Sequence, residues 1–422
     1  MRSFIAALFL FVLSLTATAQ TPKDVRAVAK QGPSAIPTVA QYLNSQSVDT
    51  RVEAIKQLIA LGGKDIIDPL IRGTRDADAE VQIRATDGLV NYYLPGYVKQ
   101  GLGSSFVRAG ASVRAKFSDS NDQTIDAFVI VRPEVIAALG QVARGGASLD
   151  ARANACRAIG ILRGQAALPD LIEALRTKDN RVMYEALVAI QKIGDPVAGP
   201  QIVYLLRDLD DRVQSVAIED VGLLRTAEAR PALRDIVNHP RNNKAERAAL
   251  ASLAFMPEAQ DRALFQHYLN SNDDKLRASA DEGLARIANP GDKASLEKAW
   301  KDEDKMLPRL AAAFGLVMNG NLDLGDEAPL RYLINTLNQA SYHEVAVAYL
   351  TEAGRRPEVR NALYKALDQG TRDEKIQLSR VLSASGDEAT IPYLEKISRD
   401  TDSEVAAEGL RALRSLRARL KV

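Results

Sequence analysis

The stretch DNRVMYEALVAIQKIG, from Asp179 to Gly194, recurs 31 residues later as DDRVQSVAIEDVGLL. Four positions correspond between the copies: Asp179 and Asp210, Val182 and Val213, Ala186 and Ala217, Ile190 and Val221. Each copy opens with an aspartate, whose carboxylate suits the unpaired N–H groups at a helix start. Apolar residues then follow at i, i+4 and i+8, the spacing of one face of a helix. The phrase therefore predicts an amphipathic helix that the chain uses more than once.

The same frame occurs along most of the chain, at residues 48–62, 78–90, 273–287 and 402–416. A small residue recurs in the middle of the apolar stripe, at Ala85, Ala186, Ala217, Ala280 and Gly409. Small side chains there let two helices approach closely. A glycine is expected to end several of these first helices in the left-handed conformation, at Gly62, Gly160, Gly194 and Gly386.

Prolines divide the chain at a similar interval, and each precedes a further apolar pattern of helical period. They stand at Pro37, Pro69, Pro133, Pro169, Pro200, Pro231, Pro329 and Pro392. Because proline is tolerated in the first turn of a helix, each one predicts the start of a second helix. A period near 31 built from two short helices indicates a solenoid, in which stacked neighbours cover the stripe that one pair leaves open. We expect an all-α fold of about eleven such pairs.

The repeated frame, D-x-x-V-x-x-x-A-x-x-x-(I/L)-G followed by a helix led by proline, resembles the short HEAT repeats named after phycobilisome lyase subunits. The match is clearest over residues 179–237 and looser over most of the rest. The resemblance implies a right-handed α-α superhelix whose second helices line the concave side. It leaves the function open, since that repeat family includes scaffolds, adaptors and a few enzymes.

The first nineteen residues have the pattern of a secretory signal peptide. Arg2 precedes the apolar run FIAALFLFVLSLTA, and Ala17 and Ala19 occupy the small-residue positions before a cut between Ala19 and Gln20. An uncleaved N-terminal anchor is the alternative. We expect an exported protein, periplasmic or extracellular. Without residues 1–19 the chain carries 54 basic and 54 acidic residues, a balance that argues against nucleic acid as the partner.

Cys156 is the single cysteine of the chain, so no intramolecular disulfide can form. It lies in ARANACRAIG, among small and apolar residues at helical spacing. This setting favours a buried structural thiol over a nucleophile.

The period breaks between Pro69 and Pro133, which are 64 residues apart where about 31 are expected. We therefore divide the mature chain into repeats at 20–94, an insertion at 95–131 and repeats at 132–422. In the insertion, apolar residues recur at every second position from Val107 to Phe117, which predicts an inserted loop or β-hairpin that presents aromatic and basic side chains to an anionic or peptide partner. The candidate partner-binding residues are Tyr92, Tyr93, Tyr97, Lys99, Phe106, Arg108, Arg114 and Lys116. The alternative is a segment that folds back to plug a groove.

Motifs for catalysis or metal binding do not stand out. The three histidines, His239, His267 and His343, lie far apart and form no H-x-x-x-H or H-E-x-x-H pattern. The single His343–Glu344 pair cannot hold two irons, as the di-iron hydroxylases built on similar repeats do. Carboxylates recur at helix starts, where capping is their expected role. We predict no cofactor, no metal and no enzymatic activity; the alternative is a lyase-like enzyme or enzyme subunit whose Asp, Glu and Tyr side chains meet across the concave groove.

The C-terminal segment 409–422 combines five basic residues with the leucines Leu410, Leu413, Leu416 and Leu420. We expect a helix that caps the last repeat, with its cations favourably placed at a helix C-terminus. A peripheral membrane contact through the same basic helix is the alternative. The sequence as a whole predicts an exported scaffold that binds another protein or peptide through its concave face and the insertion at 95–131.

Overall fold

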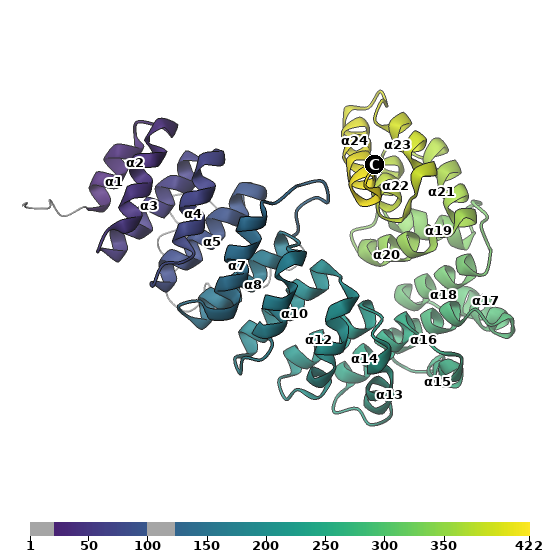
Figure 1. Cartoon of the computed structure of the whole chain (residues 1–422). Helices are drawn as coiled ribbons and strands as arrows, with labels where there is room; N and C mark the ends of the chain where they lie inside the picture. Colours follow the sequence, from purple (N-terminus) through teal and green to yellow (C-terminus); the bar gives the residue numbers. More distant parts are fainter. Residues whose placement is uncertain (1–20, 99–122) are drawn as a thin grey trace, which may run out of the picture. The chain divides into compact units, whose positions relative to one another are not determined.

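The computed structural model describes residues 21–98 and 123–422, and throughout these ranges the regular structure is helical, with no strand (Figure 1). The predicted all-α solenoid is therefore confirmed. The expected loop or β-hairpin falls mainly on residues 99–122, which lie outside the described ranges. Two compact units divide between Gly101 and Leu102, within the predicted insertion. No helix in the described ranges is long and apolar enough to cross a membrane.

Between residues 21 and 98, the first unit contains two and a half helical pairs. Its helices are α1 (Pro22–Ala29), α2 (Ile36–Gln41), α3 (Val48–Leu61), α4 (Ile67–Gly73) and α5 (Ala79–Tyr93). Here α3 and α5 carry the aspartate-led frame, while α2 and α4 carry Pro37 and Pro69 in their first turns. Val25 of α1 is fully buried, because α1 packs against α3 and covers the open end of the stack.

The second unit continues the alternation from α7 to α24. Its first helices are α8 (Leu149–Ile161), α10 (Asn180–Ile193), α12 (Asp211–Leu223), α14 (Asn243–Phe255), α16 (Asp274–Ile287), α18 (Met306–Met318), α20 (His343–Ala353), α22 (Arg372–Ser385) and α24 (Ser403–Leu420). Its second helices are α7 (Pro133–Gly145), α9 (Leu168–Ala174), α11 (Gly199–Ile202), α13 (Arg230–Asn238), α15 (Arg262–Tyr268), α17 (Lys293–Asp302), α19 (Pro329–Thr336), α21 (Pro357–Gln369) and α23 (Ile391–Ile397).

The aspartates of the repeated frame cap first helices as predicted. Each accepts hydrogen bonds from two backbone N–H groups of the following turn, at Asp78, Asp179, Asp210, Asp273 and Asp402. At Asp402 the backbone N–H of Val405, 3.1 Å away, is the main reason that the carboxyl pKa lies below its ordinary value. The caps are therefore ionised acceptors for donors that the helix itself cannot satisfy.

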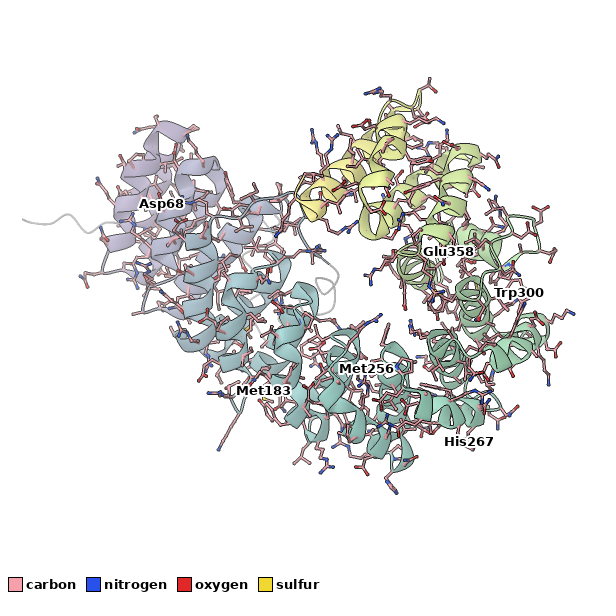
Figure 2. All side chains as sticks on the ribbon, turned by 45° about the vertical axis from the view of Figure 1, so that its right-hand side comes forward. Asp68, Met183, Met256, His267, Trp300 and Glu358 are labelled. Atoms are coloured by element: carbon pink, nitrogen blue, oxygen red, sulfur yellow. The ribbon has the colours of Figure 1, made fainter. Side chains whose placement is uncertain are left out.

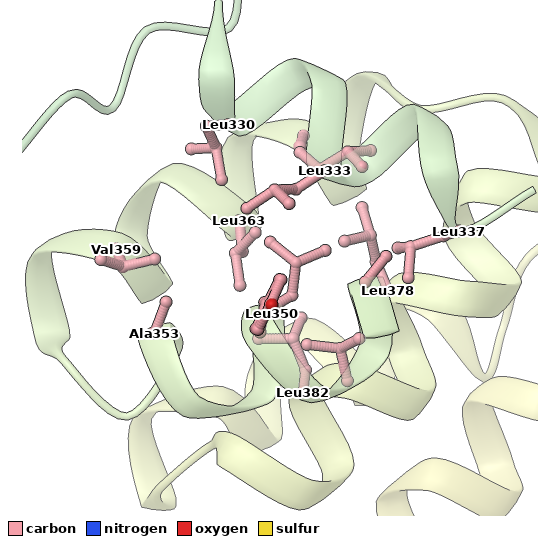
Figure 3. Close-up of a cluster of buried hydrophobic side chains, with 14 of the residues drawn as sticks. Leu330, Leu333, Leu337, Leu350, Ala353, Val359, Leu363, Leu378 and Leu382 are labelled. Atoms are coloured by element: carbon pink, nitrogen blue, oxygen red, sulfur yellow. The ribbon is translucent and has the colours of Figure 1, made fainter. Parts of the chain in front are cut away.

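The small residues of the stripe allow close packing, and Ala85 and Gly409 lie against the ends of the second helices α4 and α23. Ala85, Ala186, Ala217 and Ala280 have no exposed surface. Gly409 is tighter still, because a Cβ there would stand 2.7 Å from the backbone nitrogen of Ser398. The apolar stripes themselves merge into continuous cores, and Figure 3 shows the one around Leu333, Leu350 and Leu378 in the C-terminal half. The sequence frame thus encodes the packing of each pair on the next.

Ion pairs connect successive repeats along both edges of the stack. The basic partner belongs to one repeat and the acidic partner to the next, 25 to 30 residues further on. The pairs include Arg51–Asp76, Arg247–Asp273, Arg277–Glu303 and Lys375–Asp400 at the start of first helices, and Arg234–Asp261, Arg262–Asp292 and Arg360–Asp387 at the start of second helices. Several of the carboxylates therefore bind the neighbouring repeat as well as local N–H groups.

First helices line the inner side of the curve in the second unit, so the expectation that second helices would do so is wrong. In Figure 1, α14, α16, α18 and α20 face inward, and in Figure 2 the second-helix residues His267 and Trp300 lie outward. Contacts agree: Glu352 of α20 reaches Arg286 of α16 at 2.7 Å and Arg225, just after α12, at 3.8 Å. Helices several repeats apart can touch only on the inside of a bend.

Of the four glycine predictions, the one at Gly194 holds. Gly194 follows α10 in the left-handed conformation, with φ of 69° and ψ of 23°, whereas Gly62 follows α3 with φ of 68° but ψ of −166°. Gly160 instead lies inside α8, and the left-handed residue after that helix is Arg163, with φ of 49°. Gly386 follows α22 with φ of −67°, which any residue can adopt. These two glycines serve close packing instead, because each meets neighbouring atoms closer than a Cβ would allow.

The C-terminal helix α24 packs against α22 and α23 with Leu413 and Leu416 buried. Leu410 is 41% exposed, so the predicted four-leucine stripe is wrong at this position. The buried face runs through Gly409, Ala412, Leu413 and Leu416, and Leu410 lies about 100° from Gly409 around the helix.

Cys156 is fully buried in α8, as its sequence setting predicts. Burial, together with the nearby charge of Glu185, raises the pKa of its thiol to about 12. The thiolate that would react or bind a metal is therefore scarce at neutral pH.

Candidate functional site

The predicted partner-binding residues fall partly within the described chain. Tyr92 and Tyr93 end α5 and meet edge to face, with ring centroids 4.9 Å apart, and Tyr97 follows on the next turn. All three are half-buried, and the backbone N–H of Val98 donates to Asn91 Oδ1 at 2.9 Å, which fixes this turn. The remaining five lie outside the described residues: Lys99, Phe106, Arg108, Arg114 and Lys116. Their role in binding stays a prediction.

A groove of about 810 Å³ opens between α20 and α22, at the edge where first helices begin. Its floor contains Leu337, Val345 and Ile376. The carboxylates of Glu344 and Asp373 stand on its rim, 90% and 65% exposed. The groove therefore combines an apolar floor with an acidic rim. Its lining includes no lysine or arginine, although Arg372, next to the lining, donates to Asp373 at 2.9 Å.

The connection before α20 differs from those before most first helices. Most first helices begin after a residue whose side chain caps them, but α20 begins after Tyr342, which makes no such bond. Tyr342 has φ of 61° and ψ of 8°, a left-handed conformation that costs a tyrosine on the order of 1 kcal/mol. The chain therefore enters α20 in a left-handed conformation at a residue that itself lines the groove.

His343, the first residue of α20, is fixed at the end of this groove. Its Nδ1 donates to the backbone oxygen of Leu337 at 2.6 Å, which leaves Nε2 on the side of Glu344, 3.8 Å from Oε1. The imidazole therefore has one nitrogen committed to the backbone and one directed toward the acidic rim. The paired His343 and Glu344 of the sequence thus lie together in the lining of the groove.

A buried charge cluster fixes the bend on the inner side. Arg286 donates to both carboxylate oxygens of Glu352, at 2.9 and 2.7 Å, and to Glu282 at 2.9 Å, with only 7% of its side chain exposed. Tyr349 donates to Glu282 at 2.6 Å. Burial lowers the pKa of Arg286, but its hydrogen bonds to Glu352 and the charge of Glu282 outweigh this and raise it. Every charge here is paired, so the cluster serves the architecture.

Carboxylates with raised pKa values occur away from the groove. Burial raises the pKa of Asp220 in α12 and of Asp281 in α16 well above the ordinary value, and neighbouring carboxylates add to both shifts. Both side chains are 2% exposed or less and line neither the groove nor the other cavity described below. Across residues 21–98 and 123–422, no group of three or more His, Cys, Asp and Glu side chains is arranged to hold a metal ion.

A fold of repeated helix pairs stacked into curved layers defines the protein as an α-solenoid. Within it, residues 136–207 and 199–285 match the family model described as HEAT repeats. No curated protein matches the chain.

Solved structures with similar folds include the complex of CpcE and CpcF of phycocyanin lyase from Nostoc sp. PCC7120, with 20% identity and a TM-score of 0.37 over 62% of this chain and 90% of that one. Human deoxyhypusine hydroxylase in complex with glycerol has 18% identity and a TM-score of 0.28 over 68% and 96%. Importin beta has 12% identity and a TM-score of 0.38 over 91% of this chain and 57% of that one. Likeness at this level concerns the fold alone.

Proposed function

We propose that this HEAT-repeat protein is a scaffold that binds a segment of another protein in the groove between α20 and α22. The observation that carries the proposal is the groove beside Tyr342, where apolar side chains line a space open to solvent at the start of α20. Repeat arrays of this class offer extended binding surfaces, and specificity comes from local departures from the regular stack. The groove is such a departure.

The chemistry of the lining defines the partner. Leu337, Val345 and Ile376 suit an apolar side chain, whose burial contributes roughly 1.5–3 kcal/mol. Glu344 and Asp373 suit a lysine or arginine placed beside it. We therefore infer a partner segment with one apolar anchor and one neighbouring basic residue. A protein partner of this kind also agrees with the balanced charge of the chain, which gives it no general attraction to nucleic acid.

The binding test uses fluorescent nine-residue peptides in which one apolar and one basic position are varied, with affinity read by anisotropy. The double variant Glu344→Lys with Asp373→Lys should weaken the best peptide by at least about tenfold, because it places two cations beside the peptide's own. Glu358→Lys is the matched control, since Glu358 is an exposed acid on α21 that does not line the groove (Figure 2).

The proposal fails if no peptide of the set binds, or if the double variant binds as well as the wild type. The predicted residues of the insertion are examined in the same assay with Arg108→Glu and Arg114→Glu. A loss confined to these two variants would place the binding surface on the insertion instead of the groove.

We also propose that the scaffold acts outside the cytoplasm. The support is the signal-peptide pattern of residues 1–19, together with a single buried cysteine that needs no disulfide partner in an oxidising compartment. Mass spectrometry of the protein recovered from cell fractions should find the N-terminus at Gln20 in the exported fraction. An intact Met1 or Arg2 terminus in that fraction would contradict cleavage.

A further inference from the structure

Residues 123–131, here termed the stem, precede α7 and are held against the first helices at the start of the second unit. Ile125 is 5% exposed, and its backbone N–H donates to the oxygen of Ile161 at 3.0 Å, at the end of α8. Lys192 of α10 donates to the backbone oxygen of Gln123 at 3.2 Å. The stem is therefore attached to α8 and α10 by its backbone and by one buried side chain.

Asp126 of the stem binds Arg411 of α24, a residue 285 positions further along the chain. The guanidinium donates to Asp126 Oδ1 from Nη2 at 2.6 Å and from Nε at 3.1 Å. Arg411 belongs to the last helix of the second unit, whereas the stem lies on its first helices. The pair therefore joins the two ends of this unit, and the yellow α24 and the stem lie beside each other in Figure 2.

Further charges extend this pair into α22. Arg380 donates to both oxygens of Glu408, at 3.0 and 3.1 Å, and Glu408 Oε2 lies 4.0 Å from Arg411 Nη1. The order Arg380, Glu408, Arg411, Asp126 alternates in sign, so each inner residue has opposite charges on both sides. Glu408 thereby orients Arg411 toward the stem, and its own side chain is 12% exposed.

The junction is held by charge and not by an apolar seal. A cavity of about 370 Å³ at the same place is lined by Asp126, Arg380, Arg411 and the hydroxyls of Ser383 and Ser415. Asp126 and Arg411 are 30% and 53% exposed, and Ile130 of the stem is 90% exposed and buries nothing here. Ion pairs this open contribute roughly 0–1 kcal/mol and weaken with salt, so the junction can break at little cost.

We propose that Asp126 and Arg411 form a latch that closes the second unit on itself and opens reversibly. The closed form keeps α24 beside the stem, which is attached to α8 and α10, and the open form separates α24 from the stem and widens access to the inner first-helix face. The latch and the groove between α20 and α22 share no lining residue, and a side-chain hydrogen bond, from Arg380 to Gln377 at 3.4 Å, runs between the two linings.

The test measures the distance between spin labels on cysteines introduced at Ala166, which follows α8, and Ala418 of α24, both exposed. Cys156 is buried, so labelling is confined to the new thiols. Pulsed electron paramagnetic resonance on the full chain should give a short, narrow distribution at about 0.05 M salt and a longer, broader one at about 0.5 M. Arg411→Glu should reduce the short-distance population by roughly two- to fivefold at low salt.

Two further variants make the result decisive. Arg417→Glu is the matched control, because Arg417 is also on α24, is 45% exposed and pairs with Glu395 instead of the stem. It should leave the distribution unchanged. Asp126→Arg combined with Arg411→Glu restores an opposite pair and should recover the short distance. A wild-type distribution that is insensitive to salt and to Arg411→Glu, or one that is long under all conditions, would overturn the proposal.

Discussion

At the scale of single residues, Asp220 stands out among the described side chains because both of its carboxylate oxygens are buried without a partner. Its side chain in α12 is fully buried, and neither carboxylate oxygen has a hydrogen-bond partner. Burial, with a smaller contribution from the charge of Glu219, raises its pKa well above the ordinary value. The group is therefore held neutral in the folded protein under conditions where the unfolded chain ionises it.

This difference predicts a pH dependence with a definite sign. Below about pH 4, Asp220 is protonated in both the folded and the unfolded state, so it does not change the stability. Above about pH 4, ionisation of Asp220 stabilises only the unfolded state. The free energy of unfolding therefore falls by up to about 1.4 kcal/mol per pH unit until the raised pKa is reached. Asp220→Asn removes this penalty, so the gain in stability over wild type should grow from pH 4 upward. Urea denaturation from pH 4 to 7 measures it. A difference between the two proteins that is constant with pH would contradict a raised pKa.

The sequence predicts the role of some charged residues and not of others. Capping aspartates recur in frame before an apolar stripe, so their role follows from position alone. Asp220 and Asp281 stand at different points of their helices, and nothing in the letters separates a buried acid from a solvated one. Arg286 is similar: its partner Glu352 lies 66 residues away on the inner side of a bend that no local pattern specifies.

At the scale of helices, some pairs of helices pack closely because a glycine lies inside one of them and not at its end. A Cβ at Gly160 would lie 2.8 Å from the Cα of Ala189, on the facing helix α10. Gly145 also lies in a helix, at the end of α7, but a Cβ there would meet open space. The two positions share the helical conformation and differ in what surrounds them.

Gly160→Ala should therefore destabilise the protein by about 1–3 kcal/mol, because α8 and α10 must move apart to admit the methyl group. Gly145→Ala should be neutral or stabilise slightly, by up to about 1 kcal/mol, because alanine favours the helix. Thermal unfolding of both variants checks the contrast. Equal effects at the two sites would show that helix propensity, and not the contact with Ala189, governs Gly160.

The sequence period shows where glycines and prolines recur, but it does not show which of them begin a helix, end a helix or allow a close contact. Pro133, Pro169 and Pro231 begin second helices as predicted, because a missing N–H is harmless in a first turn. Pro308 instead lies in the first helix α18, in the region where the frame is degenerate. From its position in the sequence, Gly160 could either end a helix or allow a close contact. Which role it has depends on the residue of the facing helix, and sequence alone does not reveal that residue.

At the scale of the whole molecule, the second unit depends on α24 for the cover of its last repeat. Val405, Leu413 and Leu416 of α24 are buried together with Leu382 and Leu394 of the preceding helices. In a stack where each repeat contacts mainly its neighbours, loss of the end should spread inward and fade with distance.

Deletion of residues 403–422 should therefore abolish the hydrogen-exchange protection of α22 and α23, reduce it in α20 and α21, and leave α3 and α5 unchanged. Arg411→Glu is the control, because it removes the latch while the leucines of α24 remain in place. The gradient is measured by hydrogen exchange with mass spectrometry. A uniform loss of protection along the chain would contradict nearest-neighbour stability.

The solenoid itself could be predicted from the sequence, because one repeated frame encodes cap, stripe, close approach and turn. The groove and the latch could not. The groove involves the left-handed backbone of Tyr342, and the latch depends on the accumulated turn of all the repeats between Asp126 and Arg411. Even the inner side of the curve was predicted wrongly, since the repeat pattern is equally compatible with either layer of helices facing inward.

The ion pairs between successive repeats have a consequence for how such a chain can grow. Asp261 and Arg262 lie in one repeat, but Asp261 pairs with the preceding repeat and Arg262 with the following one. A duplicated repeat would therefore carry both an acceptor and a donor, and each would find a partner in a neighbouring repeat. Lengthening the array is therefore chemically inexpensive. The Asp126–Arg411 pair restricts such lengthening, because one additional repeat would move α24 by the length of a repeat and separate Arg411 from Asp126. Selection for that pair would fix the number of repeats in the second unit, whereas the first unit would be free to gain or lose them.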